Sequence, residues 1–176
     1  MKKTRVLISL LSVLTILIGS LVATSSTANA FSQASFVKNK AKLTFTAKTV
    51  DGKSFNSKTL ANKNPTVVWF WAPWCAICKN ESAYITAAAE QYKDKVNFVG
   101  VGALGSREEL AEFVGITGTS NFTNLDDSSG KLWNRFGIVI QPTLLFIDAK
   151  GTITSKVGPS DEKFLAKRLA ALTKKK

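Results

Sequence analysis

The sequence predicts a single α/β domain built on a central mixed β-sheet that is flanked by helices. Three features predict this class: apolar runs of strand length alternate with segments of helical periodicity, an Asp-Gly dipeptide before them indicates a hairpin, and a second strand pair with a final helix follows them. A chain that alternates in this way forms a sheet covered on both faces.

The first half of the domain is predicted to contain a hairpin, a buried strand and a long helix. Asp51-Gly52 tolerates the positive backbone angles of a tight turn. The run after Pro65 is short, continuous and apolar, as expected of a central strand buried on both faces. The expected elements are hairpin strands over 43–47 and around 53–55, a strand over 66–71, a helix over 75–92 and a strand over 96–101.

The second half is predicted to add a helix and a strand, and then a closing hairpin with a helix. Ser106 followed three residues later by Glu109 is a capping-box pattern, so a helix begins here, and it should end near Gly115. The remaining expected elements are a strand over 122–125, a short helix over 129–136, strands over 143–147 and 152–157 on either side of a turn, and a helix over 161–172.

The first thirty residues have the features of a secretion signal. A basic start is followed by a mostly apolar stretch over 6–23, and Ala28-Asn29-Ala30 supplies the small residues that a signal peptidase reads. The alternative is an uncleaved membrane anchor, because the stretch approaches the length that spans a bilayer. In either case we expect the folded part outside the cytoplasm, secreted or in the cell envelope. The expected organisation is a signal peptide over 1–30, residues 31–42 leading into the domain, and a domain over 43–173.

The chain is basic, with a formal net charge of +12 in 176 residues. Removal of residues 1–30 would lower the charge to +9 and leave 146 residues, the size of one domain, since this segment has three basic residues and no acidic ones. A surface of this charge either holds anionic polymers of the cell envelope or keeps the protein soluble. Nucleic acid is not an expected partner, because the basic residues are scattered and export separates the protein from nucleic acid.

The chemistry of the chain is concentrated in residues 69–79, which contain its only two cysteines, Cys75 and Cys78. The chain has no histidine, so it lacks the three or four Cys and His ligands of a usual zinc site. A disulfide that closes so short a loop removes little entropy from the unfolded chain, so stabilisation explains the pair poorly. A lone pair at this spacing, where a strand gives way to a helix, indicates redox chemistry.

These residues resemble the thioredoxin superfamily. The run 71–78 follows a buried strand, and Gln141-Pro142-Thr143 enters a later one. The leading hairpin, the helix and strand inserted before Pro142 and the secretion signal are similar to the extracytoplasmic TlpA, ResA and DsbE-type branch. The resemblance covers about residues 43–172. It implies a thioredoxin-like fold, with the hairpin at its start and the inserted αβ element before a cis-proline, and a thiol-disulfide oxidoreductase.

Disulfide exchange needs one thiolate that attacks a disulfide and a second thiol that resolves the mixed disulfide. Cys75 is the expected attacker, exposed at the start of a helix, where unpaired amides and the helix dipole lower the pKa of a thiol. Cys78, one turn further on, is the expected resolving thiol. The resemblance therefore implies no cofactor other than this redox-active disulfide.

Glu81 is the third expected catalytic residue. It lies three residues beyond Cys78 on the same helix face, and it matches a Glu that is associated with managing the proton of the buried thiol in ResA-like relatives. The alternative is an ordinary acid of the first helical turns, favoured by the helix dipole. Trp69 stands where thioredoxin has a buried Asp, so proton handling by that route is absent.

A surface that docks client proteins is expected around the cysteines. Pro142 matches the cis-proline of the superfamily, whose loop faces the cysteine pair and frees the backbone of Gln141 to pair with an extended substrate. Trp74, Ala76 and Ile77 are expected to complete this surface. Ala76 and Ile77 also depart from the dipeptides common in relatives, and they carry no charge that would indicate the redox potential.

The expected function is disulfide exchange with exported cysteine-containing proteins. Oxidation is favoured because the compartment favours disulfides, over reduction for cytochrome c maturation and over isomerisation. A membrane redox partner is expected to recycle the couple, and the protein is expected to be a monomer. A metal or haem carrier of the same fold is the main non-enzyme alternative, but the histidine of copper-delivering relatives is missing. A thiol peroxidase is a further alternative, but Ala72 stands where its Thr-x-x-Cys arrangement needs threonine.

Overall fold

The computed structural model describes residues 37–38, 43–60 and 64–174, all of which belong to the unit Ala34–Lys176. The expected signal peptide over 1–30 and most of 31–42 lie outside the described residues, so these assignments stay predictions. Within the described ranges, no helix is both long and apolar enough to cross a membrane.

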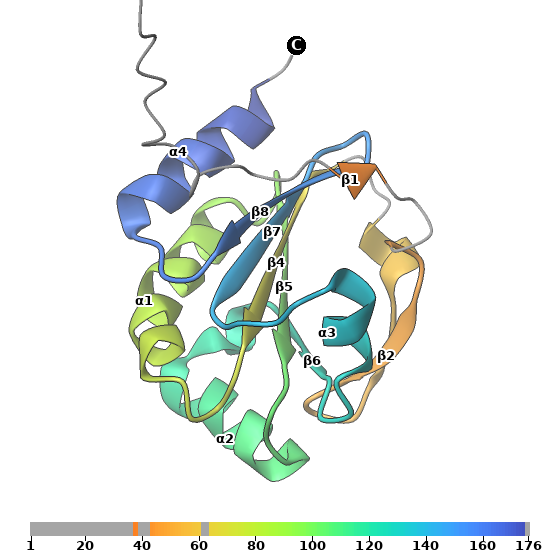
Figure 1. Ribbon diagram of the computed structural model, residues 1–176. Coiled ribbons are helices and arrows are strands. Elements are labelled where there is room, and N and C mark those ends of the chain that lie inside the picture. Colours follow the sequence, from red (N-terminus) through yellow and green to blue (C-terminus); the bar gives the residue numbers. More distant parts are fainter. Residues whose placement is uncertain (1–36, 39–42, 61–63, 175–176) are drawn as a thin grey trace, which may run out of the picture. The chain divides into compact units, whose positions relative to one another are not determined.

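The domain is built on one eight-stranded mixed sheet with the strand order β1-β8-β7-β4-β5-β6-β2-β3 (Figure 1). The central strand β4 pairs in parallel with β5 and antiparallel with β7. The mixed sheet confirms the predicted fold class. The strands are β1 (Val37–Lys38), β2 (Thr46–Thr49), β3 (Ser54–Asn56), β4 (Thr66–Trp71), β5 (Asn97–Gly102), β6 (Thr123–Asp126), β7 (Thr143–Ile147) and β8 (Thr152–Val157).

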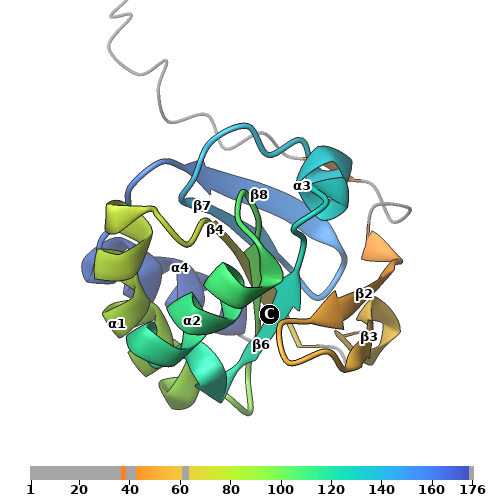
Figure 2. The same cartoon turned by 90° about the horizontal axis from the view of Figure 1, so that it is seen from below.

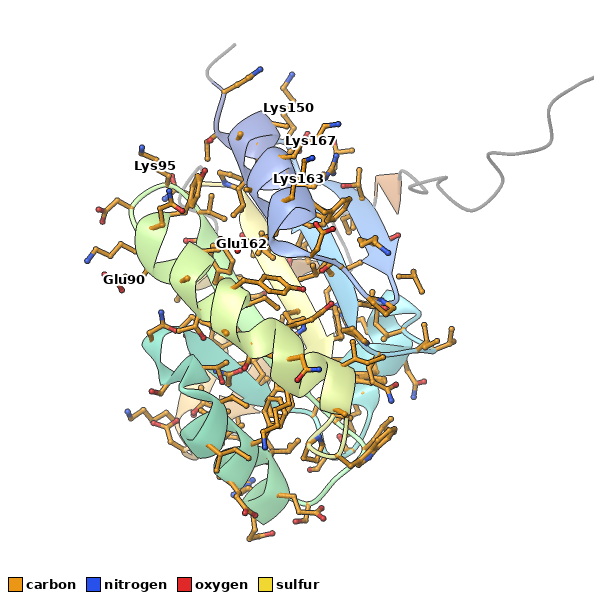
Figure 3. The ribbon with its side chains drawn as sticks, turned by 90° about the vertical axis from the view of Figure 1, so that its left-hand side faces the viewer. Glu90, Lys95, Lys150, Glu162, Lys163 and Lys167 are labelled. Carbon is orange, nitrogen blue, oxygen red and sulfur yellow. A yellow bond between two sulfur atoms is a disulfide. The ribbon has the colours of Figure 1, made fainter. Side chains whose placement is uncertain are left out.

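Helices cover both faces of this sheet, as the sequence predicts. Three of them, α1 (Ala76–Gln91), α2 (Arg107–Thr117) and α4 (Glu162–Thr173), lie on one face, whereas α3 (Lys131–Phe136) lies on the other (Figures 1 and 2). Figure 3 shows α4 packed beside α1, with Lys163 and Lys167 on its outer side. Two short 3₁₀ helices, η2 (Ser57–Leu60) and η3 (Thr119–Asn121), connect the other elements.

The core has two layers because β4 buries side chains on both of its faces. Val67, Trp69 and Trp71 pack into the cluster under α1, α2 and α4. Val68 and Phe70 pack into the cluster under α3 and the hairpin. The strand is therefore fixed rigidly just before the chain reaches the cysteines.

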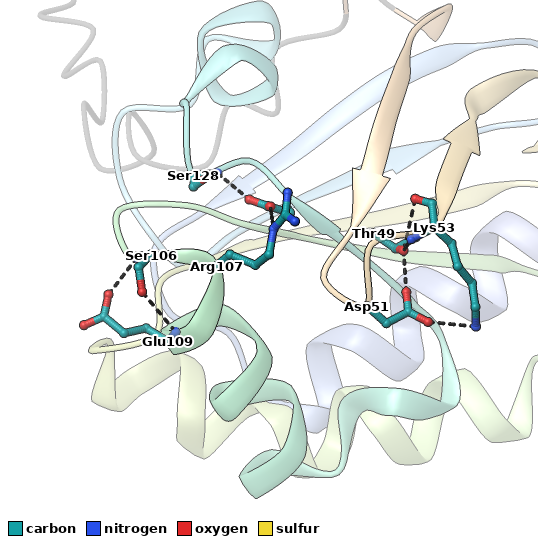
Figure 4. Close-up of polar contacts among 8 residues, drawn as sticks. Thr49, Asp51, Lys53, Ser106, Arg107, Glu109 and Ser128 are labelled. Carbon is teal, nitrogen blue, oxygen red and sulfur yellow. Dashed lines mark hydrogen bonds and ion pairs between the residues drawn. The ribbon is translucent and has the colours of Figure 1, made fainter.

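The predicted helix after Ser106 is confirmed at its start and wrong at its end. Ser106 Oγ accepts the Glu109 N–H over 3.2 Å, and the Glu109 carboxylate accepts the Ser106 N–H over 2.7 Å (Figure 4). The helix runs past Gly115 to Thr117 and is capped by Gly118, whose φ of 67° is left-handed. Gly118, and not Gly115, adopts the conformation that ends a helix.

The predicted hairpin is confirmed, but its strands begin later than expected and are joined by the four residues 50–53. Gly52 has a φ of 84°, which fits the expected role of the Asp-Gly dipeptide. Lys53 Nζ lies 2.8 Å from Asp51 Oδ2, and the Lys53 N–H donates to Thr49 Oγ1 (Figure 4). These polar contacts close the turn.

Candidate active site

Cys75 and Cys78 lie where β4 leads into α1, and their sulfurs are joined by a disulfide of 2.23 Å. Cys75 is the N-cap residue of α1, and its Sγ accepts the Cys78 N–H over 3.1 Å. Its carbonyl oxygen accepts the Lys79 N–H over 3.0 Å. The sulfur of Cys75 thus stands at the end of the helix where the backbone amides are otherwise unpaired.

Cys75 is less exposed than the sequence analysis expects. Only 7% of the residue is accessible, and Cys78 is completely buried. The expectation of an exposed Cys75 is wrong for this disulfide-bonded form, because the bond holds its sulfur against the first turn of α1. Cys75 is nevertheless the more accessible of the two.

An apolar surface adjoins the disulfide. Trp74 is 63% exposed, and Ala76 and Ile77 are exposed as well. The indole N–H of Trp74 donates to the Leu104 carbonyl over 2.8 Å, and Leu104 itself is 52% exposed. The structure therefore adds Leu104 to the residues expected here.

The loop after β5 that carries Leu104 packs tightly against the residues before Cys75. A Cβ atom at Gly105 would come within 2.5 Å of the Pro73 ring. No pattern in the sequence connects Leu104 to the cysteines, because the contact joins two connections about thirty residues apart and depends on the pairing of β4 with β5.

The loop before β7 reaches the same end of the sheet. The Gln141–Pro142 peptide bond is cis, Gln141 is half-buried and Pro142 is buried. Thr143, the first residue of β7, pairs with Phe70, close to the end of β4. Pro142 therefore lies at the edge of the sheet from which the chain continues to the cysteines. The Pro142 carbonyl accepts the Gly158 N–H over 2.9 Å, which ties this loop to the connection after β8.

Glu81 is buried, with 3% of the residue accessible. Its Oε1 accepts the backbone N–H of Ser160 over 2.7 Å and the Ser160 hydroxyl over 3.2 Å. An ordinary acid of the first helical turns would instead point into solvent. No local pattern in the sequence indicates Ser160, because its contact with Glu81 spans 79 residues.

Tyr84 extends this polar cluster. Its hydroxyl lies 2.9 Å from Ser160 Oγ. Burial, together with the neighbouring Glu81 carboxylate, raises the pKa of Tyr84 above its usual range. The Tyr84 hydroxyl therefore stays protonated and can donate a hydrogen bond to Ser160 Oγ, because the Ser160 hydroxyl donates its own hydrogen bond to Glu81.

Aromatic side chains line the interior beside the disulfide. Trp71 stacks on Phe113 of α2 with 4.3 Å between the ring centroids, and Trp69 lies 5.9 Å from Trp71. All three residues share the buried cluster of Cys75 and Cys78. Charges near the cysteines are therefore weakly screened, and Glu81 is the acidic residue that the structure buries on the helix of the pair.

Comparison with known proteins places this site in a family. The AhpC/TSA family matches residues 37–156. The soluble secreted antigen MPT53 of Mycobacterium tuberculosis is 36% identical over 135 residues, which cover 75% of this chain and 76% of MPT53. The structure of MTB dsbF in mixed oxidised and reduced forms has 37% identity and a TM-score of 0.71, covering 75% of this chain and 97% of that one. A secreted M. tuberculosis disulfide oxidoreductase homologous to E. coli DsbE has 34% identity and a TM-score of 0.71, covering 76% and 100%.

The fold, the cysteine pair and these relatives define a thiol-disulfide oxidoreductase with a thioredoxin-like fold, of the DsbE and MPT53 type. The chain belongs to the AhpC/TSA family. The resemblance stated from residues 71–78 and 141–143 is thereby confirmed.

Proposed function

We propose that this protein donates disulfides to exported proteins that contain cysteines, outside the cytoplasm. The observation that carries the proposal is the N-cap position of Cys75, whose Sγ accepts a backbone N–H of α1. A relative named as a secreted antigen and a solved secreted disulfide oxidoreductase support the compartment.

The N-cap position also supports the direction of exchange. When the disulfide is reduced, a Cys75 thiolate gains hydrogen bonds from the first amides of α1 and the favourable end of the helix dipole. These interactions stabilise the reduced protein. A stabilised reduced form makes a dithiol couple oxidising, which is the physical basis of strong disulfide donors.

The reaction proceeds through a mixed disulfide. A client thiolate attacks Cys75 Sγ, the Cys75–Cys78 bond breaks, and its electron pair leaves on Cys78 Sγ, which takes up a proton. The second client thiolate then attacks the client sulfur of the mixed disulfide, and Cys75 leaves as a thiolate. The client loses two electrons and two protons and gains a disulfide. Both client protons go to solvent when the client thiols ionise, and the proton that Cys78 takes up comes from a group of the protein.

Glu81 and the docking residues have separate proposed roles. Glu81, buried one turn after Cys78, supplies the proton that Cys78 takes up. Trp74, Ala76 and Ile77 form the surface against which a client rests. The backbone of Gln141, next to Pro142, pairs with the extended client chain. A membrane redox partner reoxidises the couple between clients.

The cysteine variants test this scheme. The oxidised protein should transfer its disulfide stoichiometrically to a reduced two-cysteine client, and C75S should transfer none. C78S should accumulate a covalent adduct with a disulfide-containing client, because the resolving thiol is gone. Full disulfide transfer by either variant would contradict the scheme. So would a covalent adduct between a client and Cys78 in C75S. S82A, which removes a buried hydroxyl on the same helix, is the matched control.

A further inference from the structure

The carboxyl group of Glu81 has two oxygens in different surroundings. Ser160, in the connection between β8 and α4, donates two hydrogen bonds to Oε1, one from its backbone N–H and one from its hydroxyl. The other oxygen, Oε2, is buried and has no hydrogen-bond partner among the described residues.

This difference decides where a proton on Glu81 must sit. An oxygen that already accepts two hydrogen bonds is the unprotonated oxygen of the acid, because a proton on it would face two donors. The proton therefore belongs on Oε2. Cys78, one turn earlier on α1, is completely buried, so its sulfur cannot exchange a proton directly with bulk water.

The titratable groups around the carboxyl group are few. On its own helix these are Cys78 and Tyr84, and Tyr84 stays protonated. Asp161, at the start of α4, follows Ser160 and accepts the N–H of Phe164 as the helix cap. A buried carboxylate next to another acid needs donors that stay in place, and Ser160 supplies both of those that Oε1 receives.

The same connection also reaches the proline loop. The Gly158 N–H donates to the Pro142 carbonyl over 2.9 Å, two residues before Ser160. A single stretch over 158–160 thus holds the acid on one side and the loop before β7 on the other.

We propose that Ser160 is a positioning residue: it holds Glu81 by Oε1 and leaves Oε2 as the oxygen that exchanges a proton with Cys78. The inference rests on the proposed disulfide exchange. When the Cys75–Cys78 bond breaks, the electron pair leaves on Cys78 Sγ and the proton on Oε2 passes to that sulfur. Glu81 is left ionised, with both Ser160 hydrogen bonds intact. When the pair is oxidised again, the proton returns to Oε2.

The test follows the carboxyl group directly. We would record ¹³C NMR titrations of the reduced protein labelled at the glutamate carboxyl carbons, with E81Q to assign the Glu81 signal. S160A removes one donor to the ionised form, so the Glu81 midpoint should move to higher pH by about one unit. The pH profile of disulfide exchange should move in the same direction. S160T keeps a hydroxyl and should restore both midpoints.

S82A is the matched control, because the Ser82 hydroxyl is buried on the same helix but donates to the Lys79 carbonyl. It should leave both midpoints in place. If S160A behaves like S82A, or if S160T fails to restore the midpoints while folding normally by circular dichroism, the proposal is wrong. Failure of the wild-type protein to exchange disulfides would instead overturn the proposed function, and the carboxyl titration would still report on Ser160.

Discussion

Leu104 combines a backbone conformation that disfavours its side chain with an exposed apolar surface. Its φ of 61° lies in the left-handed region, which costs a residue other than glycine about 1–2 kcal/mol. The side chain is half-exposed, so burial recovers little of this cost. Backbone strain of this kind is often kept where it serves a site. At Leu104 it holds the carbonyl that accepts the Trp74 indole N–H.

We expect L104G to stabilise the protein and to weaken its contact with clients. Glycine adopts the left-handed conformation freely, so the free energy of unfolding should rise by roughly 0.5–1 kcal/mol in urea denaturation. Exchange with a protein client should slow, because an apolar side chain beside Trp74 is lost. L104A is the matched variant, because it loses the same apolar side chain but keeps the cost of the left-handed backbone conformation. It should therefore be less stable than L104G and should exchange disulfides with a client equally slowly. A rate of client exchange unchanged in both variants would remove Leu104 from the docking surface.

Elements are predicted well where the local pattern alone determines them. The bounds of β4, β7 and β8 match the predictions because each is a short run flanked by turn residues. The predicted end of α2 near Gly115 is two residues too early, because the chain has a second glycine, Gly118, that takes the capping position. Which of them takes a left-handed φ depends on how the chain turns into η3.

Substitutions at these two glycines should have opposite effects on the stability of the protein. Gly115 lies inside α2 with nothing within 4 Å of an added Cβ, so G115A should raise the free energy of unfolding by about 0.5–1 kcal/mol. Gly118 has a φ of 67°, so G118A should lower it by about 1 kcal/mol. Urea denaturation of the pair measures both. Equal effects of the two substitutions would be inconsistent with a helix that ends at Gly118.

At the scale of the whole molecule, the site is assembled from four connections that meet at one edge of the sheet. They follow β4, β5 and β8 and precede β7, which runs antiparallel to β4. The sequence predicted Cys75, Cys78 and the Gln141–Pro142 loop, because each carries a local signature. It missed Leu104 and Ser160, because their contacts exist only once the strands are in register.

The direction of electron flow leads to a prediction about the stability of the whole protein. A disulfide closing so short a loop stabilises the oxidised form by about 2 kcal/mol through chain entropy. A donor of disulfides must offset this in its reduced form, and the hydrogen bonds of α1 to a Cys75 thiolate are the interactions available. In a donor, these hydrogen bonds would lower the thiol pKa in the folded state below its unfolded value of about 8.5. Their stabilisation is therefore fully present above that unfolded value, and it is lost as pH falls through the folded one.

We therefore expect the reduced protein to melt at a higher temperature than the oxidised protein near pH 9, and the order to reverse in acid. Thermal unfolding of both forms across this pH range measures the difference, and equilibration with glutathione gives the potential independently. A donor should have a potential nearer the value of about −120 mV of DsbA than the value of about −270 mV of thioredoxin. If the oxidised form is the more stable at every pH and the potential is close to that of thioredoxin, the hydrogen bonds of α1 stabilise the Cys75 thiolate by less than the disulfide stabilises the oxidised form. The protein would then be a reductant, and the proposed direction would be reversed while the exchange chemistry at Cys75 stands.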